Sequence, residues 1–340
     1  MAENSEKRPT LRSLAEITGL GISTVSQALR DSPDIALETR KRVRLAAQQA
    51  GYRPNRAGVR LRTGKSNVIT LVLNPQDGNS GGFSNQDGSS GFFANIVYGI
   101  SDALANTSYH LVVTPYSLSD PMAPVRYIVE TNSADGVIIS RTQPDDPRIR
   151  YMVENNMPFA THGRTNMGIE HAYFDYDNAA FAREAVRRLS QRGRKRVALF
   201  CPPPMLTYYL HTLQGFERGL AETGLTGFTV STVSSDSGLE GLRAAGLELA
   251  HRRDAPDAVI CTSASMVQPL ILGLGNGNME IGQDYDMVAK PISNLITLVQ
   301  PKVIGIDEDF RKAGRELAKM VVARIEGTPP ETLQVLDSPC

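Results

Sequence analysis

The chain has 340 residues, no tryptophan, three cysteines, and 36 basic against 36 acidic side chains, so its formal net charge is zero. This length allows more than one domain, and no segment is long and apolar enough to span a membrane. From the basic N-terminus we expect no secretory signal. Cys201, Cys261 and Cys340 are an odd and widely spaced set, which indicates reduced, packed thiols in a cytoplasmic protein.

The charge is divided unevenly along the chain. Residues 1–65 hold 13 Lys and Arg against 6 Asp and Glu, a net charge of +7, and the remaining residues carry a net charge of −7. Positive charge clustered on a small terminal module is typical of proteins that contact nucleic-acid phosphates. A solvated basic face is the alternative interpretation.

Residues 10–29 have the pattern of a helix-turn-helix. Ala15 is small enough to let a second helix cross close by, and Gly19 stands where the tight turn requires a positive φ. Val25 belongs to an apolar stripe that returns at helical spacing on the second helix. The same pattern fits an ordinary helical hairpin, but a third helix predicted over residues 36–50 completes a core that makes the module independent.

The segment Tyr52-Arg53-Pro54-Asn55-Arg56-Ala57-Gly58-Val59-Arg60-Leu61 follows this module directly. With the preceding helix-turn-helix it resembles the LacI/GalR family of bacterial transcriptional regulators, and the resemblance runs over nearly the whole chain. It implies a DNA-binding domain over residues 1–54, then a hinge helix and linker over 55–65 in which Leu61 wedges between base pairs from the minor groove, flanked by Arg60 and Arg62. An unstructured linker with an incidental leucine is the alternative.

The resemblance also implies which residues contact the duplex. Ile22, Ser23 and Gln27 fall where the family reads bases: Gln27 can bond an adenine, Ile22 can contact a thymine methyl, and Ser23 is permissive. A second group is placed for phosphate oxygens, which fix the register without reading sequence. This group is Thr10, Thr24, Ser26, Arg30, Asn55 and Arg56.

Residues 66–340 alternate short β-rich runs with amphipathic helices, which predicts parallel sheets with helices on both faces. The predicted strands are 68–73, 111–114, 136–139, 159–162, 196–201, 229–233, 258–261 and 285–288. The predicted helices include 94–105, 179–189, 215–222, 239–251 and 310–325.

By resemblance, this part is a periplasmic-binding-protein-like core of two doubly wound α/β lobes that close on an effector. The chain is expected to cross between lobes near residues 164–168, 291–295 and 327–333. That divides the core into an N-lobe of about 66–164 and 296–327, and a C-lobe of about 165–293 and 328–340.

Effector contacts are expected at the carboxyl ends of strands. By resemblance, the effector-binding set is Phe92, Phe93, His162, Arg164, Asp177, Thr212 and Lys290. Three of these have a plain structural alternative: core packing for one phenylalanine, a helix N-cap for Asp177, and an ordinary surface position for Lys290. If Lys290 is buried, we expect Asp177 or an anionic effector as its partner.

Several positions depart from the family pattern. Thr212 replaces an arginine that clamps a ligand, Ser263-Ala264 replaces Asn-Asp, and Ala289-Lys290-Pro291-Ile292 stands where the family often has Gly-Phe-Asp-Asp. The sequence therefore predicts a homodimeric DNA-binding regulator, most simply a repressor controlled by a sugar-type effector. A LacI-type regulator that responds to an anionic or non-sugar metabolite, or to no small effector, is the alternative. No enzymatic activity, metal or cofactor is predicted.

Overall fold

The computed structural model describes residues 9–52, 60, 64–73, 90–115, 119–290 and 302–339, with the backbone alone for residues 90–93. The chain divides into two compact units, Met1–Ser66 and Asn67–Cys340. None of the helices in these ranges combines the length and apolar character that a membrane crossing requires.

The first unit is a three-helix module built from α1 (Leu11–Thr18), α2 (Ile22–Ala28) and α3 (Leu37–Gln49). Thr10 and Ser13 form a capping box at the start of α1. Gly19 ends this helix with φ +67°, as predicted, because a left-handed residue is needed to turn the chain sharply into α2. The helices bury a small shared core of Leu14, Val25, Ala28, Val43 and Ala47.

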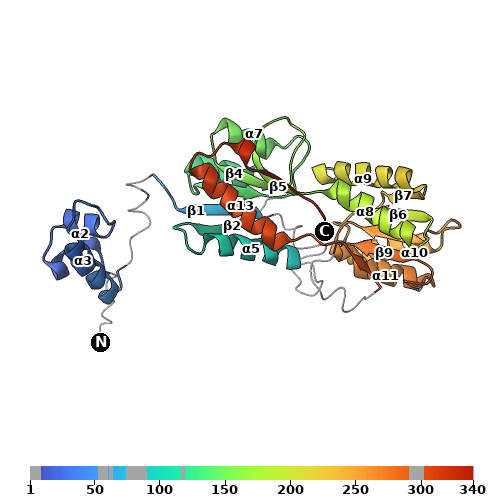
Figure 1. The fold of residues 1–340 in the computed structure, drawn as a ribbon, viewed down its shortest axis with the longest axis horizontal. Helices are drawn as coiled ribbons and strands as arrows, with labels where there is room; N and C mark the ends of the chain where they lie inside the picture. Colours follow the sequence, from blue (N-terminus) through green and yellow to red (C-terminus); the bar gives the residue numbers. More distant parts are fainter. Residues whose placement is uncertain are drawn as a thin grey trace. The chain divides into compact units, whose positions relative to one another are not determined.

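The second unit contains two parallel sheets (Figure 1). The six-stranded sheet has the order β11, β5, β4, β3, β1, β2. Its strands are β1 (Val68–Leu73), β2 (His110–Pro115), β3 (Gly136–Ile139), β4 (Phe159–His162), β5 (Ala172–Tyr176) and β11 (Gln334–Asp337). The five-stranded sheet has the order β10, β9, β8, β6, β7. Its strands are β6 (Arg196–Phe200), β7 (Thr226–Val230), β8 (Ala258–Cys261), β9 (Asp286–Ala289) and β10 (Ile304–Gly305).

Helices cover both faces of each sheet, and each face has its own apolar core. The six-stranded sheet packs against α5 (Ser90–Leu104) and α13 (Phe310–Ile325) on one face and against α6 (Ala123–Thr131) and α7 (Pro147–Glu154) on the other. The five-stranded sheet packs against α8 (Asn178–Gln191) and α9 (Thr207–Thr223) on one face and against α10 (Gly238–Ala250) and α11 (Val267–Asn276) on the other. This arrangement confirms the predicted two-lobed α/β core.

Close helix pairs account for one sequence motif. In Thr212-Leu213-Gln214-Gly215-Phe216, a Cβ on Gly215 would lie 2.0 Å from the carbonyl oxygen of Ala179 in α8. Phe216 packs in the core between α8, α9 and the five-stranded sheet. The motif is therefore explained by the crossing of α9 over α8, because only glycine lets the two backbones approach this closely.

The lobe boundaries differ from the expected ones. Residues 165–293 were expected in the C-lobe, but β5 pairs with β4 in the six-stranded sheet. Residues 328–340 were also expected there, but β11 pairs with β5 in that same sheet. In the other direction, β10 pairs with β9, so residues 304–305 belong to the five-stranded sheet and not to the N-lobe. The chain therefore passes between lobes after β5 and after β10, and residues 327–333 make no crossing.

Candidate functional site

The predicted base-reading residues lie on the outer side of α2. Ile22 and Ser23 are exposed, Gln27 is half-buried, and Val25 and Ala28 on the opposite side are fully buried in the module core. Ile22, at the start of α2, is 49% exposed and is therefore available for contact with a groove of DNA. Ile22 and Ser23 are therefore accessible to a DNA groove, and base reading by this face stays a prediction.

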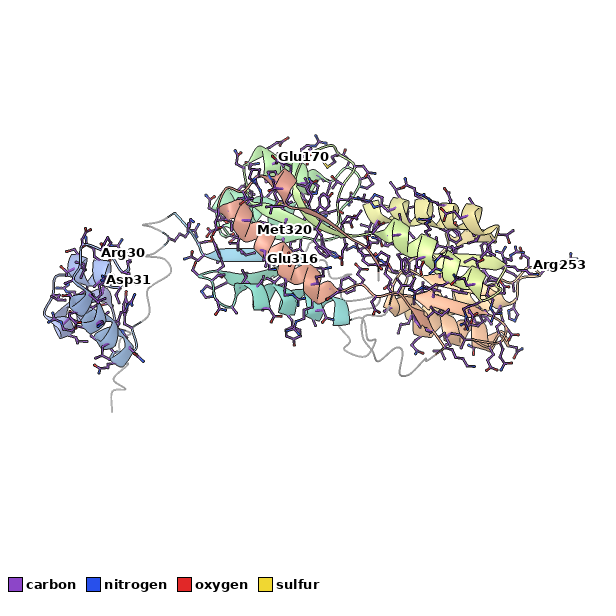
Figure 2. The ribbon with its side chains drawn as sticks, viewed as in Figure 1. Arg30, Asp31, Glu170, Arg253, Glu316 and Met320 are labelled. Atoms are coloured by element: carbon purple, nitrogen blue, oxygen red, sulfur yellow. The ribbon has the colours of Figure 1, made fainter. Side chains whose placement is uncertain are left out.

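The predicted phosphate contacts at the two ends of this motif are held in place by local bonds. The Thr10 hydroxyl accepts the Ser13 N–H at 3.2 Å, and Arg30 Nε donates to the Ser26 carbonyl oxygen at 2.9 Å. Arg30 precedes Asp31 just after α2 (Figure 2). Asp31 has φ +60° and forms ion pairs with Arg40 and Arg44 of α3. These contacts tie the end of α2 to α3.

The hinge predictions remain predictions. Asn55, Arg56, Leu61 and Arg62 lie outside the described residues. Arg60 is described and exposed, and its carbonyl oxygen accepts the Gly64 N–H at 2.8 Å.

A second set of polar residues meets where β4 and β5 end and the chain enters the other lobe. It joins the predicted His162, Arg164, Asp177 and Lys290 with four residues that sequence reasoning did not select. The additional members are Asp175, Asn178, His211 and Glu308.

Lys290 is 6% exposed at the end of β9. Its Nζ donates to Asn178 Oδ1 at 2.6 Å and to Glu308 Oε2 at 2.9 Å, and it lies 4.3 Å from the ring centroid of Tyr176 and 4.9 Å from that of Phe181. Of the two expected partners, Asp177 or an anionic effector, Asp177 is wrong, because the carboxylate that pairs with Lys290 is Glu308. A carboxylate supplied by the segment after β10 neutralises the ammonium group, and two aromatic faces complete its shell.

Asp177 is the N-cap of α8, because its carboxylate accepts the Ala180 N–H at 2.9 Å. This is the alternative role that the sequence allowed. The cap engages one carboxylate oxygen and leaves the group close enough to interact electrostatically with His211 of α9.

The Asp175 carboxylate is 3% exposed and lies 3.2 Å from Arg164 Nε, measured to its Oδ2. Burial raises the pKa of Asp175 to about 7; Arg164 opposes the rise, and the Glu308 carboxylate adds to it. Near neutral pH this group exists in both protonation states, so it can donate or accept a hydrogen bond.

Two histidines complete the cluster. His162 Nε2 lies 4.0 Å from Glu308 Oε1, and burial lowers the pKa of His162. Burial also lowers the pKa of His211 to about 4, and Arg164 acts in the same direction. Both rings are therefore neutral near pH 7, and each offers one donor and one acceptor nitrogen.

The other predicted effector residues are placed differently. Thr212 is fully buried and its hydroxyl donates to the Tyr208 carbonyl oxygen at 2.7 Å, so α9 itself satisfies this side chain. Phe92 and Phe93 were expected just before the first helix, but they lie within α5, which begins at Ser90. Their side chains lie outside what is described. Among the residues that the structure describes, His, Cys, Asp and Glu side chains form no group of three or more able to hold a metal ion.

Asp175 lies near the end of β5, and effector contacts were expected at strand ends. Because β5 itself was not predicted, this rule did not select Asp175. Glu308 precedes α13 by two residues and carried no sequence signal, because only the fold brings it to Lys290.

Comparison with known families matches both units. Residues 10–55 match the family described as bacterial regulatory proteins, lacI family. Residues 82–338 match the family described as periplasmic binding proteins and sugar binding domain of LacI family. The second match alone covers more than half of the chain.

Curated relatives are similar over almost their full length. The HTH-type transcriptional regulator AglR of Rhizobium meliloti is 30% identical over 94% of this chain and 90% of its own. The HTH-type transcriptional regulator RafR of Escherichia coli is 30% identical over 97% of this chain and 96% of its own length. The HTH-type transcriptional regulator CelR of Thermobifida fusca is 27% identical over 97% of this chain and 96% of its own length.

Two solved structures share the fold. The transcriptional regulator CelR–cellobiose complex has a TM-score of 0.69 at 25% identity and covers 98% of both chains. The lac repressor dimer bound to operator and an anti-inducer has a TM-score of 0.81 at 17% identity, covering 98% of this chain and 97% of its own. With its helix-turn-helix module, its two-lobed core and these matches, the chain belongs to the LacI family of bacterial DNA-binding transcriptional regulators.

Proposed function

We propose that this protein is a homodimeric repressor whose affinity for a two-fold symmetric operator is controlled by a neutral carbohydrate bound between the lobes. The observation that carries the effector class is the Lys290–Glu308 pair, because Glu308 neutralises the lysine that an anionic effector would otherwise have as its partner.

The charge balance of the polar cluster supports a neutral ligand. Arg164 and Lys290 are the cationic side chains, and Asp175, Asp177 and Glu308 are the carboxyl groups around them. The cluster is neutral with Asp175 protonated and carries one negative charge with it ionised. In neither state does the cluster have the excess positive charge that would favour a carboxylate or a phosphate, whereas its polar groups can bond to hydroxyls.

Unsatisfied polar atoms in the cluster support a ligand rich in hydroxyls. His211 Nδ1 and Asp175 Oδ2 are buried without a hydrogen-bond partner within the described part of the chain, although Asp175 is ion-paired. Buried polar atoms are normally hydrogen-bonded, so a bonded partner is expected at this place. A sugar hydroxyl can donate to one atom and accept from another.

The test is calorimetric titration of the full chain with a panel of small molecules. The panel holds cellobiose, maltose and raffinose as neutral sugars, and gluconate, glucose 6-phosphate and adenine as the opposing classes. We expect heat of binding from a neutral sugar alone. Binding confined to an anionic compound or to adenine would contradict the proposed class, and no binding by any member would favour a regulator without a small effector of these kinds.

Site variants connect that binding to the cluster. Asp175→Asn and His211→Gln each remove or alter one unsatisfied polar group, and we expect roughly tenfold weaker binding or more from each. Glu217→Gln on the exposed face of α9 is the matched control and should bind as the wild type does. Equal affinities in all three variants would place the ligand elsewhere.

The operator is tested by selection from random oligonucleotides. Gln27→Ala should change which symmetric site is preferred, because its amide reads a base. Arg30→Ala should weaken binding to all sequences about equally and reduce the dependence on salt. If the two variants have the same effect on sequence preference, α2 does not read bases as proposed.

A further inference from the structure

The loop after β3 reaches across from the first lobe to the second. Arg141 in this loop donates from Nη2 to Asp236 Oδ2 at 2.5 Å and from Nη1 to Asp236 Oδ1 at 3.3 Å. Asp236 lies between β7 and α10, in the other lobe. Two parallel bonds of this kind fix both the distance and the orientation of the groups that they join.

The next residue makes a second bridge. The Thr142 carbonyl oxygen accepts the backbone N–H of Thr207 at 2.9 Å and its hydroxyl at 3.1 Å. Thr207 is the first residue of α9, whose N–H has no partner within the helix. Thr142 also donates its hydroxyl to the Arg164 carbonyl oxygen at 2.9 Å, which ties the bridge to a member of the polar cluster around Lys290.

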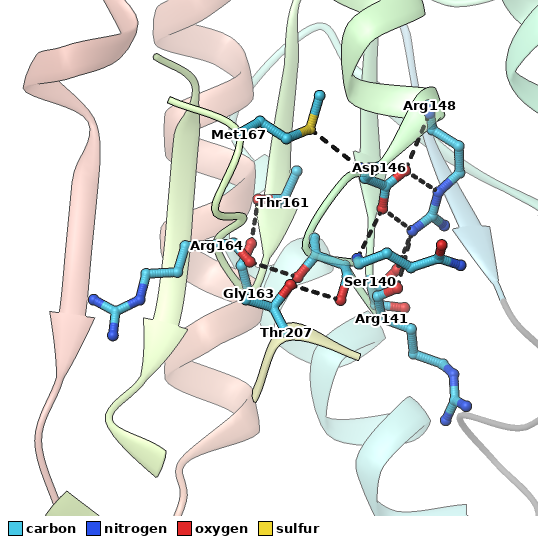
Figure 3. A network of polar contacts seen from close by, with 11 residues as sticks. Ser140, Arg141, Asp146, Arg148, Thr161, Gly163, Arg164, Met167 and Thr207 are labelled. Atoms are coloured by element: carbon cyan, nitrogen blue, oxygen red, sulfur yellow. Dashed lines mark hydrogen bonds and ion pairs between the residues drawn. The ribbon is translucent and has the colours of Figure 1, made fainter. Parts of the chain in front are cut away.

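A buried ion pair holds the loop in the shape that makes both bridges possible (Figure 3). Arg148 and Asp146 are 5% and 1% exposed, and their charged groups lie 2.7 Å apart. Arg148 Nη2 also donates to the carbonyl oxygens of Ser140 and Arg141 at 3.1 Å and 3.0 Å. Arg141 has φ +55°, an uncommon conformation that a loop holds only when other contacts enforce it.

Burial distinguishes the Arg141–Asp236 pair from ordinary surface ion pairs. Its side chains are 12% and 18% exposed, whereas those of the nearby pair between Arg150 in α7 and Asp145 just before it are 53% and 79% exposed. Water screens the pair less, and a loop that is already rigid loses little entropy when the pair forms. The pair therefore affects the relative positions of the lobes more than a surface contact would.

We propose that Arg141–Asp236, with the Thr207–Thr142 bonds, is a latch that favours a closed arrangement of the two lobes. Its regulatory meaning rests on the proposed function: a latch that favours the closed lobes raises the affinity for any effector bound between them, because less of the binding energy is used for closure. Loss of the latch should lower that affinity by roughly tenfold.

The closing experiment measures the distance between the lobes without any effector. Spin labels are attached to the full chain at Glu154→Cys in α7 and Glu217→Cys in α9, both exposed positions. Cys201 and Cys261 are buried, and Cys340→Ser removes the remaining thiol. Distances are read by pulsed electron paramagnetic resonance.

Three latch variants are compared in this background. Arg141→Asp and Asp236→Arg each place like charges together and should broaden and lengthen the distance distribution, with the open population rising about tenfold. The double variant Arg141→Asp with Asp236→Arg restores opposite charges and should recover the wild-type distribution. Arg150→Asp, in the exposed pair within one lobe, is the control and should leave the distance unchanged.

The outcomes separate the latch from the effector. An unchanged distance in the single variants, or no recovery in a double variant that keeps the wild-type circular dichroism, overturns the latch. A lengthened distance that the double variant restores supports it, whether or not a sugar binds in the calorimetric panel. Failure of every sugar to bind contradicts the proposed effector class alone.

Discussion

Removal of the Lys290 ammonium group should destabilise the core strongly. Lys290 and Glu308 are 8% and 10% exposed in their side chains, and Nζ is also bonded to Asn178. Lys290→Met leaves a buried carboxylate without its cation, which costs about 3–5 kcal/mol. For a unit of this size, each kcal/mol lowers the melting temperature by about 2 °C, so we expect a fall of about 6–10 °C.

The assay is differential scanning calorimetry of the single and double variants. Lys290→Met with Glu308→Leu removes both charges, and replacing a buried pair by apolar groups is often close to neutral, so most of the lost stability should return. Lys302→Met is the control, because Lys302 and Glu280 form a pair that is 50% and 56% exposed and worth at most about 1 kcal/mol. A single variant that melts within 2 °C of the wild type, or a double variant as unstable as the single, would refute the reasoning.

Three further results follow from packing and titration. Gly215→Ala should cost about 1–3 kcal/mol in thermal unfolding, because its Cβ would meet the Ala179 carbonyl oxygen. Gly275→Ala, with no atom within 4 Å of its Cβ, should be neutral or slightly stabilising. Equal effects of the two variants would show that the crossing of α9 over α8 tolerates a side chain. The pKa of Asp175 is raised in the folded state, so its contribution to the free energy of unfolding is fully present below the unfolded pKa near 4 and is lost as the pH rises towards 7. Asp175→Asn should remove that loss between about pH 4 and 7 in a chemical-denaturation series. An unchanged slope of the unfolding free energy against pH would contradict the assignment. The pKa of His211 is lowered in the folded state, so its contribution to the free energy of unfolding is lost as the pH falls from about 6.5 to 4. His211→Gln should make the unfolding free energy fall less steeply over this acidic range. A fall as steep as that of the wild type would exclude His211 as its source.

The sequence determined the elements whose physics is local. The strands at Val68–Leu73, Gly136–Ile139 and Ala258–Cys261 were predicted with their observed bounds, because each is a short run of residues suited to a buried strand. The positive φ of Gly19 and the burial of Val25 follow from spacing within one motif. Local patterns also placed the helix N-cap at Asp177 as one of two open roles.

Other features of local structure escaped prediction. Strand β5 was missed because Asp175 near its end and Asp177 just after it resemble the start of a helix. Strand β7 lies at Thr226–Val230, three residues earlier than expected. Helix α9 begins at Thr207, eight residues before its predicted start, since the apolar pattern near its N-terminus is weak.

Only the tertiary structure decided which charges meet. Lys290 and Glu308 belong to different segments of the chain, and so do Arg141 and Asp236, and no periodicity within one segment specifies such a pair. Sheet order placed β5 and β11 together in the first lobe, because strands pair through the backbone and the sequence of a buried parallel strand does not identify its neighbour. Local physics therefore chose the helices and strands, and long-range packing chose the partners that make the site.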